Sequence, residues 1–434
     1  MGCAKNTVDG EILSTILDNN GWQVSEYPEK SDIIILNTCG FIKDAKEESI
    51  DAILQACQLK EKNDSIKIIV TGCLGQRYSN ELKKEIPQID HIIPIMKNTD
   101  IMEIIEGSYN GNLYKKPHSL IFNDDLVMRN FDKSKPYAYL RLSEGCSNYC
   151  SYCAIPLIRG EFRSRDPDKI IKEAEYLIKN GIKELILISQ DTTSYGRDLK
   201  THVNLSYLLM SLCSIDGDFW IRLLYCHPAH FNNDLIYTVN DEDKILHYID
   251  IPIQHCNDRL LSSMGRGYTK RDIINLITQI RNKIDDAVIR TTLIVGYPGE
   301  TEEDCEELLE FIEEIEFNHL GAFKYSAEEG TRAYNMKDQI PEKIIERRLE
   351  RVMLMQADIS GEKNSMFVGN TYNTLIEKSN DPEIGKVFAR CFAQAPDVDG
   401  IIMIDNGKKS VKTDRFYKVK ITDADVYDLY GEIQ

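Results

Sequence analysis

Short hydrophobic runs recur along most of the chain, and amphipathic stretches separate them. In the first part of the sequence, the runs 32–37 and 66–71 are mainly apolar, and the stretch 43–60 between them has apolar residues at helical spacing. A third run starts at His91, after a helix that we expect from about Asn80. Continuous apolar strands joined by helices indicate a parallel sheet that is covered on both faces.

A polar stretch, 115–136, interrupts this pattern and is typical of a linker. The alternation then resumes with six strand–helix units, which predict a partial parallel β/α barrel. A long helix from Pro341 to about Lys363 should close it. The expected strands are 137–142, 184–189, 220–224, 248–251, 288–295 and 321–325, with helices such as 167–180 and 271–283 between them.

The last part of the chain differs, because short β-rich pieces follow one another with Gly and Asp turns between them. This pattern predicts a small antiparallel barrel. The whole chain is therefore expected to be an α/β multidomain protein, with domains at 1–114, 137–365 and 366–434 and the linker at 115–136. The β-rich pieces are 374–377, 385–392, 400–405 and 416–421.

Length and composition limit the class of protein. The 434 residues are 42% hydrophobic and 28% charged, enough for several folded cores. No stretch approaches the ~18 apolar residues of a membrane helix, and the first residues are polar, so we expect a cytoplasmic protein without a membrane partner. The net charge of −18 lacks the basic footprint of a nucleic-acid binder. It suits a basic partner, although a merely solvated acidic surface would give the same value.

Twelve cysteines in a reducing compartment indicate metal ligation or catalysis rather than disulfides. Cys146, Cys150 and Cys153 form the pattern C-x-x-x-C-x-x-C directly after the first expected barrel strand, where barrel active sites lie. Three thiolates at this spacing can hold a 4Fe–4S cluster whose fourth iron stays open to S-adenosylmethionine. A zinc site is the alternative, but zinc usually takes four N or S ligands, and no matching fourth ligand lies nearby.

A second set of cysteines, Cys3, Cys39 and Cys73, lies in the first part of the chain. Cys39 and Cys73 each follow an expected strand and precede a helix, so they should meet at the carboxyl edge of the sheet. Glycines beside all three would let the backbone approach a bulky cluster. Cysteine is also a common core residue. We assign the other six to the core or to incidental positions: Cys57, Cys213, Cys226, Cys256, Cys305 and Cys391.

The cysteine loop, with Tyr152 before its last cysteine, and the six barrel units resemble the radical S-adenosylmethionine superfamily. The resemblance implies that Tyr152 lies near the adenine and that Gln190, Arg290 and Gly296 line the nucleotide site. Over nearly its full length the chain also resembles the methylthiotransferase family, which has an N-terminal cluster domain, a radical domain and a small barrel called TRAM. The motifs that carry this likeness are Gly2–Asn6, Asn37–Ile42, Ala154–Pro156, Arg159-Gly160 and Arg163–Arg165.

The family resemblance implies two 4Fe–4S clusters and S-adenosylmethionine as cofactors, with an external electron donor. Cys146, Cys150 and Cys153 would hold one cluster, and Cys3, Cys39 and Cys73 a second one that carries sulfur. In this family a strand precedes the first cysteine, whereas here only Met1 and Gly2 do. Either the true start lies upstream or the first ligand is less firmly held.

Local strings favour the branch of the family that modifies an aspartate of small-subunit ribosomal protein twelve. These strings are Gly40–Ile42 with Asp44–Ile50, and Asp423–Glu432. The segment 366–434 holds nine Lys/Arg and eleven Asp/Glu, a balance of −2. A barrel that grips transfer RNA should lean basic, whereas a basic ribosomal protein prefers a neutral or acidic one.

Two alternatives remain. A transfer-RNA methylthiotransferase would use the same chemistry, and a non-catalytic iron–sulfur redox sensor or carrier would bind iron without it. The role of Arg159, Arg163 and Arg165 is also open. They could bind a substrate carboxylate bidentately, or they could form structural ion pairs.

Overall fold

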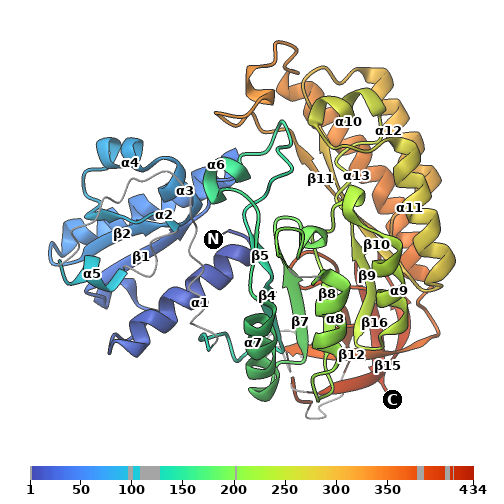
Figure 1. Ribbon diagram of the computed structural model, residues 1–434, viewed down its shortest axis with the longest axis horizontal. Helices are drawn as coiled ribbons and strands as arrows, with labels where there is room; N and C mark the ends of the chain where they lie inside the picture. Colours follow the sequence, from blue (N-terminus) through green and yellow to red (C-terminus); the bar gives the residue numbers. More distant parts are fainter. Residues whose placement is uncertain are drawn as a thin grey trace. The chain divides into compact units, whose positions relative to one another are not determined.

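Helices and strands alternate over most of the chain in the computed structural model (Figure 1). The structure describes residues 2–95, 101–107, 128–200, 203–378, 386–405, 411–413 and 415–434. Contacts between residues group the chain into two units. The first contains Met1–Phe131, Arg141–Ile170 and Ser326–Tyr334, and the second contains Asp132–Leu140, Ile171–Tyr325 and Asn335–Gln434. The loop with Cys146, Cys150 and Cys153 therefore belongs to the same unit as the N-terminal sheet.

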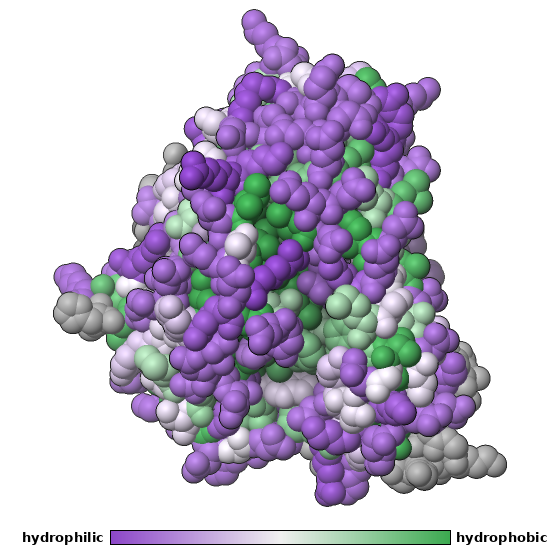
Figure 2. Space-filling model, turned by 90° about the vertical axis from the view of Figure 1, so that its right-hand side faces the viewer, coloured by the Kyte–Doolittle hydropathy of each residue, from purple (hydrophilic) through white to green (hydrophobic). Residues whose placement is uncertain are grey.

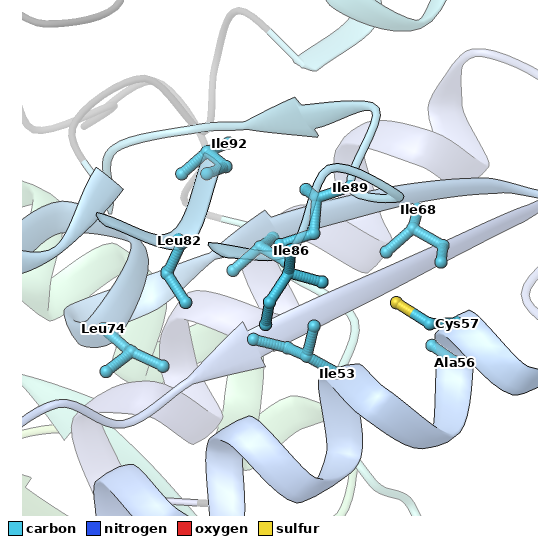
Figure 3. Close-up of a cluster of buried hydrophobic side chains, with 10 residues drawn as sticks. Ile53, Ala56, Cys57, Ile68, Leu74, Leu82, Ile86, Ile89 and Ile92 are labelled. Atoms are coloured by element: carbon cyan, nitrogen blue, oxygen red, sulfur yellow. The ribbon is translucent and has the colours of Figure 1, made fainter. Parts of the chain in front are cut away.

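The sheet of the first unit has three parallel strands in the order β1–β2–β3. Helices pack on both faces of this sheet. Neighbouring residues of β2 point to opposite faces and therefore join different cores. Ile68 packs with Ile53 and Leu82 in one core (Figure 3), and Ile69 packs with Leu13 in the other. The predicted parallel sheet with helices on both faces is confirmed. Its elements are β1 (Ile33–Thr38), β2 (Lys67–Thr71), β3 (His91–Ile92), α1 (Ala4–Asn19), α2 (Lys43–Lys62), α3 (Gly72–Arg77), α4 (Ser79–Glu85) and α5 (Ile101–Ile105).

Helix α1 has no counterpart in the sequence-based prediction. Its buried residues include the polar Lys5, Asn6 and Asp9 besides apolar ones such as Val8 and Leu13. Polar side chains on the buried face interrupt the apolar stripe by which an amphipathic helix is recognised in a sequence.

The second unit is built on a six-stranded sheet in the order β11–β10–β9–β8–β7–β4, and its six strands agree with the six predicted strand–helix units. The pairs from β7 to β11 run parallel. Capping boxes begin two of the covering helices, because Thr269 and Thr301 each exchange hydrogen bonds with an aspartate three residues later. The strands are β4 (Tyr137–Arg141), β7 (Glu184–Ile188), β8 (Trp220–Leu223), β9 (Ile245–Asp250), β10 (Val288–Val295) and β11 (His319–Lys324). The helices are α7 (Pro167–Lys179), α8 (Leu205–Cys213), α9 (Asn233–Asp241), α10 (Asp258–Met264), α11 (Lys270–Lys283), α12 (Glu302–Ile315) and α13 (Glu342–Ser365).

Five strands close the predicted C-terminal barrel in the order β12–β13–β14–β16–β15. One pair differs from the expected antiparallel arrangement, because β14 and β16 run parallel. The sequence-based prediction also lacked β16, whose buried positions include a glycine, Gly431. The strands are β12 (Thr371–Lys378), β13 (Val387–Arg390), β14 (Ile402–Ile404), β15 (Phe416–Ala424) and β16 (Leu429–Ile433).

A buried ion cluster fastens this barrel to the six-stranded sheet. Glu184, the first residue of β7, accepts hydrogen bonds from Arg222 Nε at 2.6 Å and from Arg390 of β13 at 2.6 Å. All three side chains are fully buried. Each arginine also donates to a backbone oxygen, Arg222 to Phe392 and Arg390 to Gln394. A buried charge is stable only when it is paired and hydrogen-bonded, and this cluster meets that condition.

The molecular face drawn in Figure 2 is mainly hydrophilic, with apolar side chains in small groups, in keeping with the charged composition. Among the described residues, no helix is both long and apolar enough to cross a membrane. The predicted domain boundaries remain predictions, and residues 115–127 of the predicted linker lie outside the described residues.

Candidate iron–sulfur site

The carboxyl edge of the N-terminal sheet brings Cys3, Cys39 and Cys73 together. Cys39 directly follows β1, and Cys73 lies one residue beyond the bridge between Thr38 and Gly72. Cys3 precedes the first residue of α1. The three thiols influence one another, since the charges of Cys3 and Cys39 both raise the pKa of Cys73. The sequence-based expectation that these cysteines meet at one sheet edge agrees with this arrangement.

Two glycines allow the close approach of the backbones that carry these cysteines. Gly72 has φ +90°, and a Cβ there would lie 2.3 Å from the carbonyl oxygen of Thr38. A Cβ at Gly40 would lie 2.8 Å from the backbone nitrogen of Leu74. Both positions therefore require glycine because backbone meets backbone, in addition to any space that a cluster needs.

The surroundings of Cys39 and Cys73 favour the neutral thiols. Burial raises the pKa of Cys39, and it raises that of Cys73 to about 11. The Arg159 guanidinium partly opposes both of these pKa shifts. A positively charged iron centre would favour the thiolate forms, because ligation requires the deprotonated sulfur. Three thiols beside one buried cation are a donor set that fits an iron–sulfur cluster.

The loop from Cys146 to Cys153 lies between β5 (Ser143–Glu144) and α6 (Ile155–Arg159). Its shape is fixed by backbone hydrogen bonds, from Cys146 N to Gly160 O and from Cys153 N to Cys150 O, both 3.1 Å long. Gly145 has φ +71°, and a Cβ there would lie 2.2 Å from the carbonyl oxygen of Glu161. The three thiols are half-buried, so the loop presents soft ligands that an iron–sulfur cluster could reach.

The segment Ser326–Tyr334 supports this loop from within the same unit. Arg332 donates to the carbonyl oxygen of Tyr149 at 2.8 Å, and Ala333 N donates to that of Ser151 at 2.8 Å. Tyr152, between these contacts and Cys153, is half-buried. Its predicted place near the adenine stays a prediction.

Two of the three arginines whose role the sequence left undecided, Arg159 and Arg165, form structural contacts. Arg159 is paired with Asp9 and Glu144 in the first unit. Arg165 is also buried, and it donates to the carbonyl oxygen of Arg141 at 2.7 Å. For these two residues the structure favours the ion-pair and scaffold interpretation over direct recognition of a substrate carboxylate.

The predicted nucleotide-site residues of the second unit lie at different levels of the sheet. Gln190 comes two residues after β7, and Gly296 directly follows β10. Gly296 has φ +82°, and its backbone N–H donates to Glu300 at 2.7 Å. Arg290, in contrast, is the third residue of β10, and its guanidinium donates to Asp250 and to Asp399 of the C-terminal barrel. These contacts give no support to a nucleotide-binding role for Arg290.

Asp191, His227 and His230 form a compact group that was not predicted from the sequence. Their potential metal-ligating atoms lie within 4.8 Å of one another. The Asp191 carboxylate already accepts bonds from His230 at 2.7 Å and from Ser194 Oγ at 2.8 Å. It also caps a short helical turn, since the backbone N–H of Ser194 donates to it. Asp191 therefore acts as the cap of this turn. The only sequence signal for the group was polar residues that follow two adjacent strands.

Family models match three successive parts of the chain. Residues 1–94 match the uncharacterized protein family UPF0004, residues 140–312 the radical SAM superfamily and residues 368–433 the TRAM domain. The fold is also similar to that of the radical S-adenosylmethionine methyltransferase TsrM from Kitasatospora setae, with a TM-score of 0.56 at 14% identity over 73% of this chain and 72% of that one. Fold and sequence thus define a radical S-adenosylmethionine enzyme with a TRAM barrel.

Relatives narrow this class further. The ribosomal protein uS12 methylthiotransferase RimO of Natranaerobius thermophilus is 45% identical over the whole chain and 97% of its own length. Those of Thermodesulfovibrio yellowstonii and Clostridioides difficile are 44% and 43% identical, again over the whole chain, and over 98% and 97% of their own lengths. The chain belongs to the RimO family. The predicted likeness to the protein-modifying branch of the methylthiotransferases is therefore confirmed.

Membership of this family also confirms an iron–sulfur cluster and S-adenosylmethionine as cofactors. The number of clusters and the ligands of each remain predictions.

Proposed function

We propose that this chain adds a methylthio group to the β-carbon of an aspartate in ribosomal protein uS12. The observation that carries the proposal is its similarity, over the whole chain, to three relatives that are named for modifying uS12. The matched region includes the segments that contain both cysteine sets, because it covers the whole chain.

The proposal assigns a different task to each cysteine set. Cys146, Cys150 and Cys153 would hold the cluster at which S-adenosylmethionine supplies an adenosyl radical, and Cys3, Cys39 and Cys73 would hold a second 4Fe–4S cluster that supplies sulfur. The shared sheet edge of the second set and its buried cation support this assignment. Tyr152, Gln190 and Gly296 would contact the nucleotide.

The substrate in this proposal is a basic ribosomal protein. A chain with a net charge of −18 attracts such a partner. The location would be cytoplasmic, and an external electron donor would be needed because cleavage of S-adenosylmethionine consumes an electron. Transfer RNA is the less favoured substrate, since the segment that contains the TRAM barrel has a balance of −2.

Cysteine variants test the division between the two sets. Alanine at Cys146, Cys150 or Cys153 should abolish formation of 5′-deoxyadenosine after anaerobic reconstitution. Alanine at Cys39 or Cys73 should spare it and abolish methylthiolation, measured by the mass of uS12. The matched control is Cys57→Ala, which removes a buried thiol from the core of the same unit and should leave both activities in place.

Each contradictory result has its own meaning. Normal methylthiolation by the Cys39 variant would refute the two-set assignment. A wild-type chain that modifies bulk transfer RNA but not uS12 would move the substrate to the nucleic acid. Iron binding without any 5′-deoxyadenosine would indicate a redox sensor or carrier.

A further inference from the structure

A fully enclosed arginine lies between the two cysteine sets. Arg159 is the last residue of α6 and is 2% exposed. Its Nη2 donates to Asp9 at 2.8 Å and to Asn6 at 3.1 Å, both on α1. The same nitrogen lies 3.6 Å from the sulfur of Cys73 and donates to it.

The other end of this guanidinium reaches the second loop. Nη1 of Arg159 donates to Glu144 at 3.0 Å, and Glu144 in turn accepts a bond from the backbone N–H of Gly145, the residue before Cys146. Ala154 and Ile158 also pack with Cys73 in one small core. The Arg159 side chain therefore contacts Cys73 of the N-terminal set directly, and it contacts the start of the other cysteine loop through Glu144.

Two arginines and two carboxylates form the ion pairs of this network. Arg141 donates to Asp9 at 2.6 Å and to Glu144 at 3.0 Å, so two arginines face two carboxylates. A Cys73 thiolate would add a negative charge to this network. Arg159 is the cation in direct contact with that thiolate.

We propose that Arg159 is a positioning residue that fixes Cys73 as a cluster ligand and, through its N–H···S hydrogen bond, raises the reduction potential of the N-terminal cluster. The inference rests on the proposed function, because it requires that Cys3, Cys39 and Cys73 hold a cluster. Hydrogen bonds to ligand sulfur and nearby positive charge stabilise the reduced, more negative state of an iron–sulfur cluster.

Arg141 provides a matched control within the same network. It contacts the same two carboxylates as Arg159, and its side chain is also mostly buried. The structure records no contact between Arg141 and a cysteine among the described residues. If Arg159 acts only through the stability of the network, substitutions of Arg159 and of Arg141 should have the same effects. If Arg159 acts on the cluster, only its substitutions should change the iron content or the potential.

The test uses the full chain with Cys146, Cys150 and Cys153 replaced by Ala, so that only the N-terminal set can bind iron. Arg159→Lys, Arg159→Gln, Arg141→Lys and Arg141→Gln are added singly. After anaerobic reconstitution with iron and sulfide, bound iron is counted and the midpoint potential is measured by a redox titration followed by electron paramagnetic resonance. The unfolding temperature of each apo chain reports the loss of network stability.

The parent should bind about four irons per chain. Arg159→Gln should either shift the midpoint to a more negative potential or lose the iron, and Arg159→Lys should shift it less because lysine keeps the charge. Both Arg141 variants should lower the unfolding temperature to a similar degree, yet keep the iron and the parental potential.

Two results would overturn the inference. Arg159→Gln could keep the parental potential and iron content, or the Arg141 variants could match the Arg159 variants in potential shift or iron loss. In the latter case Arg159 acts only through the network. Absence of iron from the parent, when the wild-type chain binds one cluster only, would instead refute the proposed second cluster and so remove the premise.

Discussion

Gly72 shows how tightly single residues are constrained at the cysteine edge of the N-terminal sheet. It combines a left-handed backbone with a neighbouring strand so near that the position of a Cβ is already occupied by Thr38. Cys73 is the next residue, so any shift of this backbone is passed directly to the thiol.

Gly72→Ala should therefore destabilise the first unit and disturb its cysteine set. Gly21→Ala is the control, because Gly21 has φ +82° and, apart from its two chain neighbours, no atom of the described residues lies within 4 Å of the place that a Cβ would take. The control should cost about 1 kcal/mol for its backbone conformation alone, and Gly72→Ala about 3 kcal/mol or more because the strand ends must separate. Denaturant unfolding of the apo chains measures both, and equal losses would contradict the steric argument.

At this scale the positions of the cysteines could be predicted from the sequence better than the surroundings of these cysteines. Cys39 and Cys73 could be placed at one edge because each follows a strand, and parallel strands end at the same side. The role of Arg159 could not be decided, because its partner Asp9 lies 150 residues earlier. Whether a charge is buried and paired depends on tertiary contacts that a local pattern does not contain.

Among the elements, strands were predicted more reliably than the first helix. Parallel strands that are covered on both faces contain continuous apolar runs, and β1 and β2 show such runs at Ile33–Leu36 and Ile68–Val70. Helix α1 escaped prediction because its buried Asn6 and Asp9 face the network around Arg159 rather than a hydrocarbon core. These polar contacts interrupt the apolar pattern by which the helix could have been predicted.

The attachment of β13 to β7 depends on Glu184. Burial alone would raise the pKa of Glu184, but Arg390 and Arg222 reverse this and lower it. The stabilisation is therefore fully present above the unfolded-state pKa and is lost as the pH falls through the lower folded-state value. The attachment should weaken in acid.

Glu184→Gln should cost about 3–5 kcal/mol of unfolding free energy at neutral pH, because it leaves two buried arginines without their shared carboxylate. The variant should also lose less stability than the wild type when the pH is lowered. Glu377→Gln removes the partly exposed second partner of Arg390 and should cost only about 1 kcal/mol. Chemical unfolding at several pH values measures both, and similar costs for the two variants would show that the buried pairing contributes little.

For the whole molecule, the distribution of charge governs how a partner approaches. The excess of acidic residues extends along the chain, with 70 Asp and Glu against 52 Lys and Arg. This excess does not determine the fold, but it attracts a basic substrate over distances of about a Debye length.

The kcat/KM for uS12 should fall about tenfold when NaCl is raised from about 50 mM to about 500 mM, because salt screens this attraction. Formation of 5′-deoxyadenosine without uS12 serves as the control and should change little, since its cofactor is small. A kcat/KM that is insensitive to salt would show that the acidic surface is only solvated.

The grouping of residues into units has a consequence for exchanging parts between members of this family. The segments Arg141–Ile170 and Ser326–Tyr334 lie far along the sequence from the N-terminal sheet, yet they belong to its unit. A chimera joined at the predicted boundary near residue 137 would pair the Arg159 of one parent with the Asp9 of another. The first unit is therefore encoded by three separate segments of the gene. A chimera should take all three segments from the same parent if the contacts between the two cysteine sets are to be kept.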